Sequence, residues 1–268
     1  MRRLPLRLLA LAVVALAALP FWLQLCGSIT AGPDLIARGL SLLPGRLSGI
    51  AYRDFCEWGG MHWLANSLAV STVAALGQCA VSGLAGYAFA WKRFPGRDWL
   101  FWLLVASMAL PAQALLVPRF VLVRKLGLSG YPALLLVYWV ATSGILLVRQ
   151  FARSIPAEVM DAARMDGAGE VRLLWSVVFP ALRSCLVLVA AGTFIGAWAD
   201  LFWPQLLLRG DNMTLAVGLF WLSAQHIGDY GTRMTRLMAG GVVSMVPVLL
   251  VFLSAQGQLE RGFTTEWE

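Results

Sequence analysis

The chain has 268 residues, of which 59% are hydrophobic and only 13% are charged, and its formal net charge is +7. Its mean hydropathy is +0.74. Soluble domains carry about 25% charged residues, so the composition excludes an ordinary soluble domain and predicts an all-α, polytopic membrane helix bundle. A span needs about 20 apolar residues, and the length therefore accommodates roughly six spans.

The first apolar segment runs from Leu8 to Cys26 and follows Arg2, Arg3 and Arg7. Small residues near Ala17 could form a secretory cleavage site, but the segment is long for a signal core and further apolar segments follow, which favours an uncleaved first span. The segment from Gly27 to Trp63 mixes Gly, Pro and charges of both signs. We expect it to be an external loop with room for a short helix.

Apolar runs predict six transmembrane helices. Pro111 and Pro247 are expected to kink the third and the sixth. Small residues four apart, Ser82 with Gly86 and Gly192 with Gly196, predict close helix packing. The predicted spans are residues 8–26, 66–90, 99–122, 131–150, 184–204 and 238–256. The predicted domains are 1–63, an N-terminal span and external loop; 64–257, the transmembrane domain; and 258–268, a short cytoplasmic tail.

Basic residues set the expected orientation. They cluster before the first span, between the second and third, and around residues 149–183, which places both termini in the cytoplasm if six spans alternate. The match is imperfect, because Arg119, Arg124 and Lys125 then lie outside. Basic residues beside spans indicate topology signals, so we expect no nucleic-acid partner. The four cysteines form no CxxC and predict no metal site; a bridge between Cys26 and Cys56 stays open.

A polar segment, residues 154–170, interrupts the apolar pattern. Each charge at the bilayer centre costs about 3 kcal/mol, so burying its several charges in lipid would cost on the order of 15 kcal/mol or more. Ser154 is expected to cap a helix with Pro156 in its first turn. Gly167 can form a left-handed turn after Asp166, with a second helix from about Gly169. The pattern predicts a surface helix, a sharp turn and a helix that returns to the membrane.

This segment resembles the cytoplasmic loop of permease subunits in ABC-type importers. The pattern of that loop is Glu-Ala-Ala, three residues, Gly, nine residues, then Ile-x-Leu-Pro. Here Asp161-Ala162-Ala163, Gly167, Val177, Phe179 and Pro180 stand at the same spacing, with Asp, Val and Phe in place of Glu, Ile and Leu. The surrounding Ser154-Ile155-Pro156 and Met165-Asp166-Gly167-Ala168 narrow the resemblance to the carbohydrate, maltose-permease-like class. Blocks such as Tyr87-Ala88-Phe89-Ala90 and Trp198 to Pro204 agree with it. Ala199, where that class usually has Asn, and an acidic C-terminal end depart from it.

The resemblance implies a permease subunit of an ATP-driven importer, expected to carry sugars and to form half of the translocation path. It implies no enzymatic activity and no cofactor in this chain, which lacks a GxxxxGK[ST] motif; ATP-Mg would bind a separate ATPase. The implied partners are a cytoplasmic ABC ATPase dimer, a second homologous permease subunit, an external solute-binding protein and the lipid of a bacterial plasma membrane. The residues implied to couple to the ATPase are Glu158, Asp161, Ala162, Ala163, Asp166 and Gly167.

Polar and aromatic residues in the spans are candidates for the solute path. Asp200 is either a functional intramembrane acid or a hydrated structural one. Trp198 and Trp203 could stack on sugar faces, although interfacial anchoring is favoured. The path candidates are Asn66, Gln113, Thr193, Trp198 and Asp200, and further polar candidates in the spans are Gln78, Ser107 and Gln205.

Two alternative functions stay open. One is an ABC permease for a non-sugar solute such as a polyol phosphate, because the outer arginines would suit an anion. The other is an ion-coupled secondary transporter, which would require inverted repeats and paired ionisable residues at the midplane that the sequence does not show.

Overall fold

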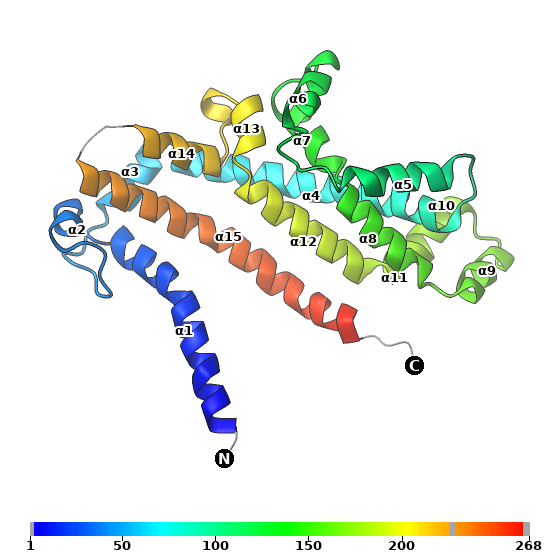
Figure 1. Cartoon of the computed structure of the whole chain (residues 1–268), viewed down its shortest axis with the longest axis horizontal. Coiled ribbons are helices and arrows are strands. Elements are labelled where there is room, and N and C mark those ends of the chain that lie inside the picture. The colour runs from blue at the N-terminus through cyan, green and yellow to red at the C-terminus, as the bar shows by residue number, and fades with distance from the viewer. Residues whose placement is uncertain (1–2, 226–228, 265–268) are drawn as a thin grey trace. The chain divides into compact units, whose positions relative to one another are not determined.

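The computed structural model describes residues 3–225 and 229–264. Within these ranges the regular structure is helical, apart from an isolated bridge between Thr30 and Leu47 (Figure 1). The prediction of an all-α fold is therefore confirmed. The acidic end of the predicted tail, residues 265–268, lies outside the described residues.

The chain divides into two compact units. Unit 1 comprises Met1–Asn66 and Gly210–Leu249, and unit 2 comprises Ser67–Arg209 and Leu250–Glu268. Two long helices contribute to both units: α4, Gly60–Trp91, and α15, Tyr230–Thr264.

Unit 1 contains the predicted external segment, and two short helices form within it. A buried ion pair joins α3 to α15, with Asp54 Oδ2 2.7 Å from Arg236 Nη2. Cys26 and Cys56 are both free thiols, so the possible bridge between them is not formed. The elements of this unit, besides its parts of α4 and α15, are α1 (Arg3–Ser28), α2 (Gly32–Arg38), α3 (Ile50–Glu57), the 3-10 turn η2 (Gly210–Asn212) and α14 (Leu215–Ala224).

Unit 2 is built around α8, which packs against α5 and α12, while α7 packs against α13. The helices before the polar segment are α5 (Arg97–Ser107), α6 (Leu116–Lys125), α7 (Gly130–Trp139) and α8 (Thr142–Arg153). Those that follow are α9 (Ala157–Met165), α10 (Glu170–Leu173), the π-helix η1 (Leu174–Val178), α11 (Phe179–Ala181), α12 (Arg183–Ala199) and α13 (Phe202–Leu207).

Four helical stretches in the described residues are long and apolar enough to cross a membrane, and a fifth results if two helices bent by 76° count as one span. Large apolar side chains along α1 are mostly exposed, as expected of a helix that contacts lipid. The stretches are Leu6–Ser28, Gly60–Trp91, Gly130–Arg153 and Tyr230–Gly257, and the bent pair is Glu170–Ala181 with Arg183–Ala199. Each overlaps one of the predicted spans.

The predicted third span, 99–122, is interrupted around Pro111, where the sequence predicted a kink, and the interruption is a full break between two helices. The helix α5 ends at Ser107, and α6 begins only at Leu116. Pro111 lies in the turn between them, where its missing N–H and its effect on the preceding residue prevent a continuous helix. The fifth predicted span, 184–204, is also interrupted, because Asp200 adopts an extended conformation that ends α12.

The two predicted small-residue pairs have different roles. A Cβ added to Gly86 would lie 2.6 Å from Cγ1 of Val148, so this glycine permits close packing of α4 on α8 as predicted. A Cβ on Gly192 or Gly196 would meet no atom of the described residues within 4 Å. Close packing at this second pair is therefore not found within the described chain.

Candidate functional site

The polar segment forms a hairpin of α9, a tight turn and α10. The N–H of Gly167 donates to the carbonyl of Arg164, and the N–H of Ala168 donates to that of Ala163, both at 3.0 Å. Gly167 has φ +78°, the left-handed region that glycine enters without strain. This is a Schellman motif, which confirms the predicted turn at Asp166 and Gly167.

The N-terminus of α9 differs from the prediction. Its N-cap residue is Pro156, and no side chain caps the helix. The hydroxyl of Ser154 instead donates to the carbonyl of Phe151, at 2.8 Å. Ser154 follows the last residue of α8, where backbone carbonyls lack a helical partner, so its hydroxyl satisfies the end of that helix. The predicted Ser154 cap is therefore wrong.

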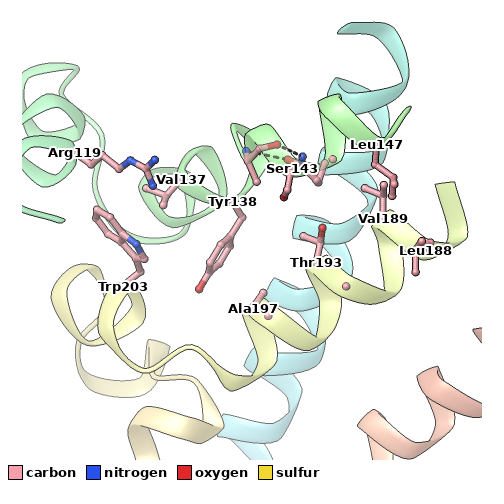
Figure 2. Close-up of a pocket in the computed structure, with 15 residues that line it drawn as sticks. Arg119, Val137, Tyr138, Ser143, Leu147, Leu188, Val189, Thr193, Ala197 and Trp203 are labelled. Atoms are coloured by element: carbon pink, nitrogen blue, oxygen red, sulfur yellow. Dashed lines mark hydrogen bonds between the residues drawn. The ribbon is translucent and has the colours of Figure 1, made fainter. Parts of the chain in front are cut away.

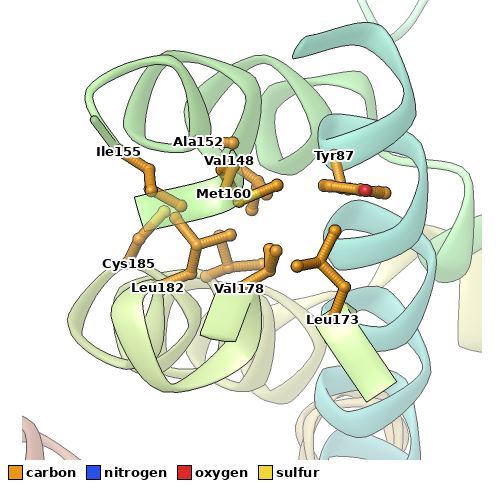
Figure 3. Packing of buried hydrophobic residues seen from close by; sticks show 10 residues of the cluster. Tyr87, Val148, Ala152, Ile155, Met160, Leu173, Val178, Leu182 and Cys185 are labelled. Atoms are coloured by element: carbon orange, nitrogen blue, oxygen red, sulfur yellow. The ribbon is translucent and has the colours of Figure 1, made fainter. Parts of the chain in front are cut away.

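One side chain anchors α9 to the rest of unit 2. Met160 is fully buried in a cluster of ten apolar residues from α4, α8, α9 and the α10–α12 region (Figure 3). A flexible thioether side chain fills an irregular space of this kind well. Because full burial of an apolar side chain contributes about 1.5–3 kcal/mol, this contact holds the helix against its support.

The second arm of the hairpin is held against the end of α4. The carboxylate of Glu170 accepts a hydrogen bond from the hydroxyl of Tyr87, at 3.0 Å, and pairs with Lys92. The following π-helix lets Leu173 and Val178, five residues apart, both enter the buried cluster.

A departure from the resembled motif is accommodated in the same region. Phe179, where the motif has Leu, lies against α4 at Gly83, where an added Cβ would come within 2.9 Å of the ring. The glycine therefore leaves room for the larger ring.

The outer face of the hairpin carries the predicted coupling residues. Glu158, Asp161, Ala162, Asp166 and Gly167 are exposed, and Ala163 is half-buried against the Met160 cluster. Asp161 and Arg164 form an exposed ion pair at 3.0 Å, which is worth little in water. A large apolar side chain is also uncovered here, because Met165 is 88% exposed. Such a mixture of exposed apolar and charged groups on a rigid support is typical of a protein interaction surface.

A cavity of about 580 Å³ lies elsewhere in unit 2. Figure 2 shows Arg119 of α6, Tyr138 of α7 and Trp203 of α13 gathered at one end, and Thr193 on α12. The amide of Gln78 supports this cavity, because it donates to the carbonyl of Ala141 at 2.7 Å and accepts from its N–H at 3.3 Å. This pairing satisfies the backbone at the break between α7 and α8.

Residues 82–265 match the family of binding-protein-dependent transport system inner membrane components. The chain belongs to this family. The family description names a membrane component of a transport system, so the chain is a transport subunit and an integral membrane protein. The predicted resemblance to ABC importer permeases is confirmed.

Individual relatives agree with the family. The arabinooligosaccharides transport system permease protein AraQ of Halalkalibacterium halodurans is 30% identical over 94% of this chain and 91% of its own length. The sn-glycerol-3-phosphate transport system permease protein UgpE of Pectobacterium atrosepticum is 32% identical over 74% of this chain and 71% of its own. A crystallised bacterial ABC transporter involved in the import of the acidic polysaccharide alginate contains a chain with the same fold, with a TM-score of 0.81, 24% identity and 94% of each chain covered.

The path residues predicted from the sequence have different surroundings within their own units. Thr193 lines the cavity of unit 2. Gln113 is exposed in the turn between α5 and α6. Trp198 is 5% exposed and stacks on Phe194, with ring centroids 5.8 Å apart. Asn66, in unit 1, donates to the carbonyls of Asp211 and Met213, at 2.8 and 3.0 Å.

Asp200 organises the end of the cavity at which the aromatic side chains lie. One carboxylate oxygen accepts a hydrogen bond from the hydroxyl of Tyr138, at 2.9 Å. The other accepts from the backbone N–H of Phe202, at 2.9 Å, and of Trp203, at 3.4 Å. The acid therefore fixes two aromatic residues that line the cavity.

Two residues at the aromatic end of the cavity, Arg119 and Tyr138, were not predicted from the sequence to line a solute path. Arg119 was interpreted as a topology signal and, with the other outer arginines, as suited to an anion, but it was not placed among the path candidates; Tyr138 was not singled out. The pairing of Tyr138 with Asp200 spans 62 positions of the chain, and no local pattern indicates it.

Proposed function

We propose that this chain is the membrane-spanning permease subunit of an ATP-driven ABC importer for sugars, in which it forms half of the translocation path. The observation that carries the proposal is the α9 hairpin. Its exposed face lies on a support fixed by Met160 and by the Tyr87–Glu170–Lys92 contacts. A rigid surface of this kind can transmit force from a partner to the helices behind it.

The partner at the hairpin is a cytoplasmic ABC ATPase dimer, which binds ATP-Mg; this chain itself uses no cofactor. A second homologous permease subunit forms the other half of the path, and an external solute-binding protein delivers the solute. Glu158, Asp161, Ala162, Ala163, Asp166 and Gly167 form the ATPase-coupling surface. The complex lies in a bacterial plasma membrane with both termini of this chain in the cytoplasm, because the basic clusters favour that side.

Sugar transport is supported by AraQ, whose name specifies arabinooligosaccharides. A second candidate, a polyol phosphate, is supported by UgpE, whose name specifies sn-glycerol 3-phosphate. Both candidates use the same hairpin and the same partners, so the test of coupling is independent of the solute.

Cross-linking tests the position of the hairpin. The complex carrying Cys56→Ser, which removes the exposed native thiol, receives Ala162→Cys and a series of single cysteines along the ATPase surface. We expect a disulfide between the two chains. Ser41→Cys, exposed in the predicted external loop, is the matched control and should not cross-link. A hairpin cysteine that forms no cross-link with any ATPase position would contradict the proposal.

A charge reversal tests coupling. Asp161→Lys should abolish solute-stimulated ATPase activity and transport while the complex stays assembled in the membrane. Glu57→Lys, an exposed acid on α3, is the control and should retain both activities. Normal transport by the Asp161→Lys complex would refute the assigned role of the hairpin.

A further inference from the structure

The cavity of unit 2 has two chemically different ends. Arg119, Tyr138 and Trp203 lie at one end, whereas Leu147, Leu188 and Val189 lie at the other (Figure 2). Gly192 and Gly196 of α12 also line the cavity, without side chains. Arg119 is the only lining residue with a formal charge. A transport path for neutral solutes does not require a cation at this place.

The guanidinium of Arg119 has no partner within the described part of the chain. None of the five ion pairs there includes it, and no side-chain hydrogen bond reaches it. The side chain of Arg119 is exposed rather than buried. Because guanidinium presents its donors in a planar fork, it binds a carboxylate or a phosphate through two parallel hydrogen bonds. The free cation is therefore available to an anion that enters the cavity.

The two aromatic side chains beside Arg119 are held by contacts within unit 2, because both pack against the buried cluster of Val70, Leu134 and Leu208. Asp200 accepts hydrogen bonds from the hydroxyl of Tyr138 and from the backbone N–H of Trp203. Aromatic rings offer large apolar faces, against which the C–H face of a sugar ring can pack. Fixing these rings in advance lowers the entropy lost on binding.

The glycines of α12 keep the cavity open. Since an added Cβ at Gly192 or Gly196 would contact no described atom, larger residues there would extend into empty space. The volume of about 580 Å³ lies within the range of about 300–1,000 Å³ typical of small-molecule pockets. One or two sugar rings fit such a volume.

We propose that this cavity is a subsite for acidic sugars, in which Arg119 binds the carboxylate or phosphate group and Trp203 packs against the sugar ring. The inference rests on the proposed function and narrows its substrate class to sugars and sugar-like polyols that carry negative charge. Tyr138 and Asp200 are positioning residues in this arrangement.

The test uses the whole importer, reconstituted in lipid vesicles with its ATPase, second permease and solute-binding protein. Three probes are compared: digalacturonate, sn-glycerol 3-phosphate and the neutral arabinobiose. The native complex should transport at least one charged probe. Arg119→Gln should lower kcat/KM for that probe roughly tenfold to a hundredfold, as expected for loss of charge-assisted hydrogen bonds, and leave arabinobiose transport unchanged if it occurs.

Four further variants sharpen the comparison. Arg119→Lys keeps the charge but not the fork, so it should retain part of the activity. Arg124→Gln, on the same helix but outside the cavity, is the matched control and should behave as the native complex. Gly196→Leu should block the charged probe by filling the cavity, and Gly196→Ala should have a smaller effect.

The outcomes distinguish a failure of the acidic-sugar subsite from a failure of the sugar importer itself. Transport of arabinobiose alone, or an equal loss of charged and neutral probes in Arg119→Gln, would overturn the subsite and leave the sugar importer in place. A defect confined to vesicles with anionic lipids would assign Arg119 to a lipid phosphate and also overturn the subsite. A complex that transports none of the three probes, with an ATPase that none stimulates, would overturn the sugar importer itself and the subsite with it.

Discussion

Met160 is the fully buried side chain through which α9, the helix of the proposed coupling surface, packs against the membrane helices. It is the one fully buried residue of α9, while its neighbour Val159 is 47% exposed. The contacts of Met160 lie on elements that come from both sides of the hairpin in sequence, including Val148 of α8 and Leu182 before α12. A displacement of α9 must therefore move these residues or open a cavity among them.

Truncating this side chain should uncouple the hairpin. We expect Met160→Ala to destabilise the local packing by about 2–5 kcal/mol, because it removes buried apolar volume without a group to replace it. Amide hydrogen exchange across 157–165 should become faster, and solute-stimulated ATPase activity should fall. Val159→Ala is the matched control and should leave the exchange of α9 nearly unchanged. Equal effects of the two substitutions would argue against Met160 as the anchor.

At the scale of secondary-structure elements, the turn after α9 depends on one glycine. The left-handed conformation of Gly167 closes two hydrogen bonds to the end of α9. An L-residue in this conformation costs about 1–2 kcal/mol. No described atom lies within 4 Å of a Cβ at Gly167, so the cost of a substitution there is conformational rather than steric.

Gly167→Ala should therefore loosen the turn without a clash. In this variant the backbone amides at positions 167 and 168 should exchange roughly fivefold to thirtyfold faster, the equivalent of about 1–2 kcal/mol. Gly169→Ala provides the control, because Gly169 has φ −68° and equally open space around a Cβ. Unchanged exchange in Gly167→Ala would mean that the turn is held by contacts other than its own backbone.

The same elements indicate what a single sequence can predict. The turn at Gly167 and the surface helix after Pro156 follow from local chemistry, since glycine and proline restrict the backbone wherever they occur. The ends of α5 and α6 were missed because hydropathy averages over a window and does not register the turn around Pro111. The roles of Ser154 and of Gly192 with Gly196 depended on which neighbour each residue meets, which local sequence does not specify.

The candidate site likewise has one part that the sequence predicts, the hairpin, and one part that it does not, the cavity. The predicted coupling residues came from the resemblance to the importer loop, and all of them except the half-buried Ala163 are exposed on the hairpin. The cavity was not predicted, because Gln78, Arg119, Tyr138 and Trp203 come from four helices. Only the packing of those helices brings the four side chains together.

For the whole molecule, the side of the membrane on which the hairpin lies depends on α5 and α6. Three stretches before α9 are long and apolar enough to cross: Leu6–Ser28, Gly60–Trp91 and Gly130–Arg153. Three crossings alone would place the N-terminus and the hairpin on opposite sides. A fourth crossing would place them on the same side, as the basic clusters require.

Neither α5 nor α6 can cross alone. At 1.5 Å per residue their 11 and 10 residues are each about 15–17 Å long, against a hydrocarbon core of about 30 Å. Placed end to end, α5 and α6 have a combined length that matches the thickness of the hydrocarbon core. The turn between them forms its own backbone hydrogen bonds, from Ala114 to Pro111 and from Leu116 to Gln113. A turn with satisfied backbone groups can lie at membrane depth where protein covers it. We therefore expect α5 and α6 to cross together as one broken span.

Labelling of introduced cysteines checks this expectation. The parent chain with Cys56→Ser alone, which keeps Cys26, Cys79 and Cys185, gives the background. In the Cys56→Ser background, Arg93→Cys lies in the connection before α5 and Ser129→Cys lies in the connection after α6, and both positions are exposed. A membrane-impermeant maleimide added to intact cells should label Ser129→Cys and should reach Arg93→Cys only after the membrane is opened. Labelling of both from the same side would mean that α5 and α6 do not cross. The N-terminus and the α9 hairpin would then lie on opposite faces, and a cytoplasmic ATPase could not meet the hairpin unless the N-terminus were outside.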